Sequence, residues 1–210
     1  ATLKLDQSSQ PFTLNVPGIP TSITLDPEHH WLLRLQREQL SPMLNGWDTD
    51  TRRILIRAKT SSKEEETSLK ALMRRVQGQP DIEIRKEDSP EISDQGSYLI
   101  IGTPARQLLE SKTLQGCNEN VQMETGHITI LEQPFEGPEM AFLITCPHPH
   151  FSNHTVTLFF GLSHKAVTPI ARLLFFYGWD SYLVFKQGKV VARGMFQPVH
   201  SAREFTIPTP

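Results

Sequence analysis

The sequence lacks the features that mark several common classes of protein. Only two of its 210 residues are cysteines, so neither a multi-bridge disulfide framework nor a zinc site made of thiolates alone is possible. Its longest apolar run, residues 173–177, is far shorter than the ~18 residues of a membrane-spanning helix. The formal net charge is −2, which argues against nucleic-acid binding through a strongly basic surface and leaves only a local basic patch open. We therefore expect a soluble protein without a membrane span and without a nucleic-acid partner.

Familiar catalytic and nucleotide-binding motifs are also missing. The 210 residues contain no H-E-x-x-H zinc-peptidase motif, and no G-x-G-x-x-G or G-x-x-x-x-G-K-[ST] phosphate-binding loop. One disulfide between Cys117 and Cys146 is allowed but not indicated, so the cysteines leave the compartment open. The sequence starts at Ala1 without Met or a signal-peptide pattern, which favours a piece of a longer protein.

The sequence divides into an N-terminal arm and a longer α/β region. Residues 1–25 alternate loosely between apolar and polar side chains, as in short strands, and Asp26-Pro27 then opens a helical connector that ends near Ser41-Pro42. We predict a β arm with a helical connector over residues 1–45 and an α/β domain over residues 46–210.

Strand and helix patterns alternate from Arg52 onward. Short apolar runs predict strands, and apolar residues at helical spacing predict three helices, the last with Thr168 as its cap and Pro169 in its first turn. Paired alternating runs predict two β-hairpins. The expected strands are at 54–56, 82–84, 98–101, 121–123, 128–130, 141–145, 155–160, 182–185 and 190–196. The predicted fold is α/β: a mixed, mostly parallel sheet with covering helices and edge hairpins, preceded by a short β arm.

Two strand-to-helix turns are candidate anion-binding sites. Each combines a glycine, a hydroxyl residue and a basic residue at the carboxyl end of a strand, where helix N-termini present free N–H groups. The residues are Gly102, Thr103 and Arg106 in one turn, and Gly161, Ser163 and Lys165 in the other. The alternative, which we favour from sequence alone, is that both are ordinary turns between a strand and a helix.

Ser163 also raises the possibility of a serine hydrolase, with His164 or His154 and Asp180 as partners. In α/β-hydrolases the nucleophilic serine lies in a G-x-S-x-G motif at a tight turn between a strand and a helix. Residues 161–165 do not match the last position of this motif, where Lys165 stands in place of a small residue. A role for Ser163 as a helix cap is therefore favoured over a role as nucleophile.

One loop concentrates metal-ligating residue types. Cys146, His148, His150 and His154 fall within nine residues, and all four are types that bind zinc or copper. Their spacing matches no tetrahedral zinc template, so a solvated, proline-rich loop is favoured. We expect no cofactor.

Two stretches resemble bacterial aminopeptidase N-like zinc metallopeptidases (gluzincins). Residues 16–40, with Thr24-Leu25-Asp26-Pro27, resemble the join that follows their β-rich part. Residues 177–194 resemble a Tyr-Gly-x-x-Ser-Tyr-Leu-x-Phe run in the α/β region after their catalytic part, with matches at Tyr177, Gly178, Ser181 and Tyr182. Together they cover about a fifth of the chain.

The resemblance implies a non-catalytic accessory domain that packs against or positions the catalytic part of a parent protein. Its partner would be the remainder of that parent chain, and its location would be the bacterial envelope or periplasm. The zinc site of the parent protein would lie on residues outside these 210. No catalytic residue is carried over. The alternatives are a stand-alone domain that binds a small anion or a metal, and a serine hydrolase.

Overall fold

The computed structural model describes residues 11–24, 35–59, 63–79, 81–124, 126–199 and 204–207. The chain forms two compact units, one of residues 1–34 with 201–210 and one of residues 35–200. In the first, β1 (Ser22–Thr24) pairs antiparallel with β12 (Glu204–Thr206). These units differ from the predicted 1–45 and 46–210, because the C-terminal tail is the partner of the arm. Most of the predicted helical connector, residues 25–34, lies outside the described residues.

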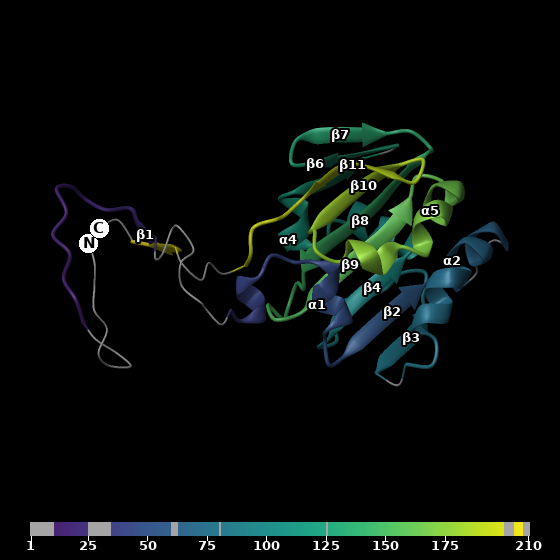
Figure 1. The fold of residues 1–210 in the computed structure, drawn as a ribbon, viewed down its shortest axis with the longest axis horizontal. Helices are drawn as coiled ribbons and strands as arrows, with labels where there is room; N and C mark the ends of the chain where they lie inside the picture. Colours follow the sequence, from purple (N-terminus) through teal and green to yellow (C-terminus); the bar gives the residue numbers. More distant parts are fainter. Residues whose placement is uncertain are drawn as a thin grey trace. The chain divides into compact units, whose positions relative to one another are not determined.

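A seven-stranded mixed sheet forms the centre of the larger unit (Figure 1). Its order is β11-β10-β8-β9-β4-β2-β3, in which β3, β2, β4 and β9 run parallel and β8, β10 and β11 add antiparallel neighbours. The strands are β2 (Arg53–Arg57), β3 (Ile82–Lys86), β4 (Ser97–Ile101), β8 (Met140–Pro147), β9 (Thr155–Gly161), β10 (Tyr182–Lys186) and β11 (Lys189–Gly194). The predicted α/β class and its closing hairpin, β10–β11, are confirmed.

Both faces of this sheet are covered, which explains the unbroken apolar runs of its strands. Ile54 and Ile56 of β2 belong to one core, and Leu55 between them belongs to the other. The first core is shared with α3 (Thr103–Glu110), α4 (Gln115–Asn118) and a second, three-stranded sheet of β5 (Val121–Glu124), β6 (His127–Ile130) and β7 (Gln133–Glu136). The second is shared with α1 (Leu44–Asp48), α2 (Lys63–Val76), α5 (His164–Ala171) and the short 3₁₀ helix η2 (Leu174–Tyr177). A further 3₁₀ helix, η1 (Arg37–Gln39), precedes α1.

The start of α5 differs from the sequence prediction. The helix begins directly after Ser163, so Pro169 lies inside it and not in its first turn. Burial of Val167 and Ile170 against the sheet favours an early start, and in a helix of about two turns the proline removes only one internal hydrogen bond. Likewise Gly102, and not Thr103, is the N-cap of α3.

A disulfide joins the two layers on the α3 side. Cys117 of α4 and Cys146 of β8 are bonded, with their Cα atoms 5.2 Å apart, and both side chains are fully buried. The sequence allowed this pairing without indicating it. No helix in the described part of the chain is long and apolar enough to cross a bilayer.

Candidate functional site

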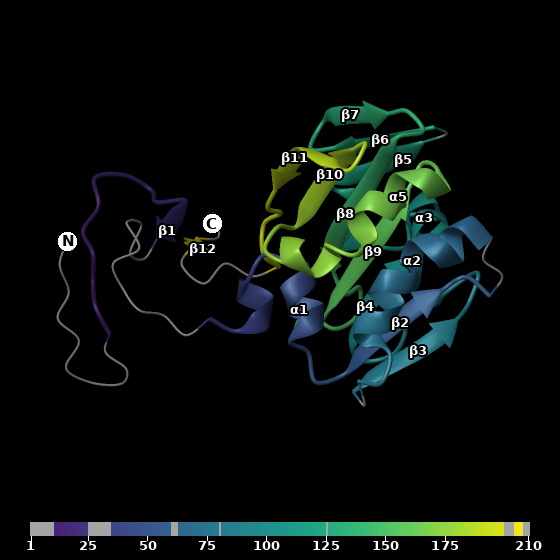
Figure 2. The ribbon, with the colours of Figure 1, turned by 45° about the vertical axis from the view of Figure 1, so that its right-hand side comes forward.

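The strongest candidate site lies where β4 and β9 end. These neighbouring strands are parallel, yet α3 follows β4 on one face of the sheet and α5 follows β9 on the other (Figure 2). Helices that leave adjacent parallel strands in opposite directions open a crevice beyond the carboxyl ends of those strands. In open α/β sheets this switch point is the usual place for ligands.

Glycines shape both walls of the crevice. Gly102 has φ 76° and ψ −139°, a conformation that side chains disfavour, and its N–H donates to the Phe159 carbonyl at 2.8 Å. At Gly161 a Cβ atom would lie 2.6 Å from the carbonyl oxygen of Ser163. Both turns therefore close tightly only because these positions lack a side chain.

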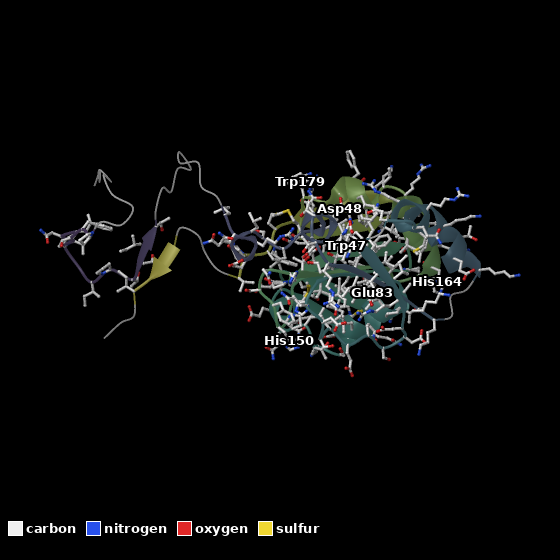
Figure 3. All side chains as sticks on the ribbon, turned by 90° about the horizontal axis from the view of Figure 1, so that it is seen from below. Trp47, Asp48, Glu83, His150, His164 and Trp179 are labelled. Atoms are coloured by element: carbon white, nitrogen blue, oxygen red, sulfur yellow. A yellow bond between two sulfur atoms is a disulfide. The ribbon has the colours of Figure 1, made fainter. Side chains whose placement is uncertain are left out.

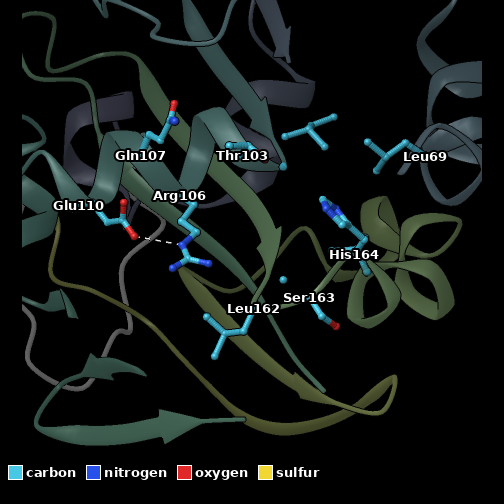
Figure 4. A pocket seen from close by; sticks show the side chains of 12 residues that line it. Leu69, Thr103, Arg106, Gln107, Glu110, Leu162, Ser163 and His164 are labelled. Carbon is cyan, nitrogen blue, oxygen red and sulfur yellow. Dashed lines mark hydrogen bonds and ion pairs between the residues drawn. The ribbon is translucent and has the colours of Figure 1, made fainter. Parts of the chain in front are cut away.

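The two turns line one cavity of about 380 Å³ (Figure 4). Five of the six predicted anion-site residues are in its wall: Gly102, Thr103, Arg106, Gly161 and Ser163. Lys165, the sixth, is exposed and does not line it. The cavity wall also includes Glu110, which the sequence analysis did not identify although it lies at i+4 from Arg106, and His164, which was considered only as a partner of Ser163 in a hydrolase.

Arg106 supplies positive charge to this cavity, and the carboxylate of Glu110 partly neutralises that charge. Nε of Arg106 donates to Oε1 of Glu110 at 3.0 Å, and both side chains are partly exposed. The guanidinium extends from α3 toward Leu162 on the facing turn (Figure 4). Because a guanidinium has five N–H groups, the bond to Glu110 leaves donors for a ligand.

The serine-hydrolase interpretation does not fit this geometry. Ser163 follows the carboxyl end of β9, and its hydroxyl donates to the Pro138 carbonyl at 2.5 Å. His154 precedes the amino end of the same seven-residue strand, about 20 Å away. Asp180 precedes β10, which runs in the same direction as β9, and its carboxylate accepts two hydrogen bonds from Arg193. The serine is therefore at the opposite end of the sheet from these two partners.

The His-rich loop does not assemble the predicted metal site. The sulfur of Cys146 is in the disulfide. The Nδ1 atom of His148 accepts hydrogen bonds from the backbone N–H groups of His150 and Phe151, so its Nε2 carries the hydrogen and donates to the Asp94 carbonyl at 3.1 Å. Burial lowers the pKa of His148 from 6.5 to about 4, which keeps this ring neutral.

The other two imidazoles also fail to converge. His150 is exposed at the surface (Figure 3), and His154 is turned toward Asp50. Among the described residues no group of three or more His, Cys, Asp or Glu side chains is placed to hold a metal ion. The loop therefore serves as a structural connection between β8 and β9.

His154 belongs to a buried cluster of polar side chains and not to a metal site. The central residue of this cluster is Asp50, which the sequence analysis did not identify. The Asp50 carboxylate accepts hydrogen bonds from Nδ1 of His154 at 2.7 Å and from Oγ of Ser97 at 2.5 Å. Burial of Asp50 acts to raise the pKa of its carboxyl, but the bonds from Ser97, His154 and the Arg52 N–H outweigh burial and lower the pKa below 3.8. No local motif links residues so far apart in the chain.

In comparisons with known proteins, no family model and no curated protein matches the chain. The gluzincin resemblance therefore stays a prediction. In the structure the matching residues have packing roles: the Gly178 carbonyl accepts a bond from the Asn45 N–H, and the Ser181 backbone bonds to Gly194 and Thr145.

Proposed function

We propose that the unit of residues 35–200 binds a small anion in the crevice between β4 and β9. The observation that supports this most is the convergence of two separate strand-to-helix turns on one cavity. The first N–H groups of a helix have no partner within it, and they carry a partial positive charge. In α3, Pro104 has no N–H and the Ala105 N–H bonds to the Gly102 carbonyl. The positive ends of α3 and α5 and the Arg106 guanidinium nevertheless surround the same space.

The size and charge of the crevice indicate the class of ligand. A volume of about 380 Å³ falls within the range of small-molecule sites, roughly 300–1,000 Å³. Helix N-termini and a guanidinium together favour a phosphate or carboxylate group. The Glu110 carboxylate partly neutralises Arg106, so we expect moderate affinity for a simple inorganic anion.

An accessory role within a larger protein is compatible with anion binding, and it rests on the gluzincin resemblance alone. Under this proposal the partner is the remainder of the parent chain. The buried Cys117–Cys146 disulfide supports an oxidising location such as the bacterial periplasm, because disulfides are rare in reducing compartments.

The test is a titration of the full chain with inorganic phosphate, followed in amide NMR spectra at constant ionic strength. Saturable shifts are expected at residues 102–106 and 162–166, and Arg106→Gln should weaken binding about tenfold. Lys165→Gln is the matched control, since it removes the same charge from the start of α5 outside the cavity wall. Equal losses in both variants, or shifts that never saturate, would contradict the proposal.

A further inference from the structure

A basic hollow, separate from the anion crevice, lies between α2 and β2. Its volume is about 490 Å³. The charged side chains of its wall are Arg57, Lys63, Glu66, Lys70 and Arg74. Arg57 is the last residue of β2, and the other four belong to α2. The walls of the hollow and of the crevice have only Leu69 in common.

The basic side chains of this wall lack anionic partners. In the described part of the chain none of the four forms an ion pair, although Glu66 lies at i+3 from Lys63 and at i−4 from Lys70. By contrast, Arg85 and Arg193 each contact an aspartate carboxylate, at 2.6 and 2.7 Å. The basic charges around the hollow therefore repel one another without compensation.

Arg57 makes this deficit more costly. Its side chain is only partly exposed, and its Nε atom is buried without a hydrogen-bond acceptor among the described residues. A charged group that is removed from water is normally paired. A partly buried guanidinium without a partner, beside three more cations on the wall of one cavity, points to a missing anion.

The basic residues of α2 lie on one face of the helix. Lys63, Lys70 and Arg74 are separated by seven and four residues, a spacing that places them on one stripe. At 1.5 Å per residue, Lys63 and Lys70 are about 10 Å apart along the axis, and Lys70 and Arg74 about 6 Å. One phosphate group is too small to contact all three. Two anionic groups joined by a short body can do so.

The charge and composition of the wall indicate the class of ligand. Four basic side chains and one acidic side chain give the wall a net charge of +3. Two phosphate monoester groups carry about −3 to −4 at pH 7, so a bisphosphate matches this charge. The Thr67 hydroxyl, which is also in the wall, donates to the Lys63 carbonyl at 2.7 Å. Its oxygen can still accept a hydrogen bond from a ligand hydroxyl.

The same wall disfavours a nucleic acid or a membrane as the source of the phosphates. The described wall contains no aromatic side chain on which a nucleobase could stack. Its large apolar side chains are Leu69, which is buried, and Met73, which is half-buried, so neither projects into a bilayer. A small soluble ligand fits better.

We propose that this hollow binds a small, soluble polyol that carries two phosphate groups. One phosphate group contacts Lys70 and Arg74, and the other lies toward Lys63, where Arg57 of β2 adds its charge. A hydroxyl group of the body donates to Thr67. The inference is independent of the anion crevice.

The test compares fructose 1,6-bisphosphate with fructose 6-phosphate, which lacks one phosphate group. Both are titrated calorimetrically into the full chain at an ionic strength of about 0.15 M. We expect the bisphosphate to bind at least about tenfold more tightly, because only it can contact both ends of the stripe. In amide NMR spectra its binding should shift residues 63–77 to saturation.

Variants locate the ligand. Lys70→Gln and Arg74→Gln should each weaken bisphosphate binding about fivefold to tenfold. Arg75→Gln is the matched control, since it removes the same charge from an exposed position beside Arg74 and outside the wall. It should change the affinity less than about twofold, because solvent and salt screen its charge. Arg106→Gln, in the anion crevice, should leave bisphosphate binding unchanged.

Three outcomes would overturn the proposal. They are equal affinity for the two sugar phosphates, equal losses in Arg74→Gln and Arg75→Gln, and bisphosphate shifts at residues 102–106 that disappear in Arg106→Gln. The last outcome would place the bisphosphate in the crevice and so support the proposed function. Saturable shifts at residues 63–77 in a chain that binds no inorganic phosphate at the crevice would instead contradict only the proposed function.

Discussion

Nδ1 of His154 lies 2.7 Å from the Asp50 carboxylate, although 104 residues separate them in the sequence. The same carboxylate accepts a bond from Ser97, whose Oγ in turn accepts one from the Thr155 N–H. Asp50 follows α1, Ser97 begins β4 and His154 precedes β9. One buried carboxylate thus connects three segments at the amino ends of the central strands.

We predict that Asp50→Ala lowers the free energy of unfolding by about 2–4 kcal/mol, because it leaves buried donors of Ser97 and His154 without an acceptor. Asp48→Ala is the control, since that carboxylate is 39% exposed and lies 4.0 Å from Arg53. It should change stability by less than about 1 kcal/mol. Urea unfolding measures both, and equal effects would refute a special role for Asp50.

The buried His148 predicts that stability falls on acidification. Its pKa is about 4 in the folded protein against an ordinary 6.5, because burial disfavours the charged ring. Between these values the unfolded chain binds more protons, so stability rises with pH from about 4 to about 6.5. Urea midpoints at several pH values should show this slope, and His148→Gln should flatten it. His150→Gln, at an exposed position of the loop, should retain it; a flat wild-type profile would contradict the prediction.

Loss of the Cys117–Cys146 disulfide should destabilise the larger unit. The bridge spans 29 residues, for which chain-entropy arguments give about 2–4 kcal/mol. Unfolding of the Cys117→Ala/Cys146→Ala double variant should match that of reduced wild type. Titration of free thiols in the unreduced, denatured protein is the independent check, and recovery of both thiols would show that the bridge does not form.

Glu110→Gln should strengthen phosphate binding at the β4–β9 crevice roughly threefold to tenfold, because it removes the negative charge beside Arg106. The gain should shrink with added salt. Glu136→Gln, at an exposed position on β7 outside the cavity wall, is the control for net charge. A gain of the same size in both variants would show that the effect is not local to the crevice.

Local patterns in the sequence identified all seven strands of the main sheet, but not β7 of the three-stranded sheet. The run Ile54-Leu55-Ile56 predicted a strand buried on both faces, and the structure places its side chains in two separate cores. The turns at Gly102 and Gly161 were also recognisable, because a glycine between a strand and a helix is a local signal. The start of α5 was predicted wrongly. Burial of Val167 and Ile170 outweighs the local preference of Pro169 for the first turn of a helix.

By itself the sequence determined the α/β class, the strands of the main sheet, the three longer helices and the residues of each candidate turn, because these depend on periodicity and turn chemistry within a few residues. Only the tertiary structure decided that β4 and β9 are neighbours, that β1 pairs with β12, that Cys117 bonds to Cys146, and that Asp50 binds His154. Each of these contacts joins segments distant in the chain. Strand order and core packing select such partners, and no local pattern encodes them.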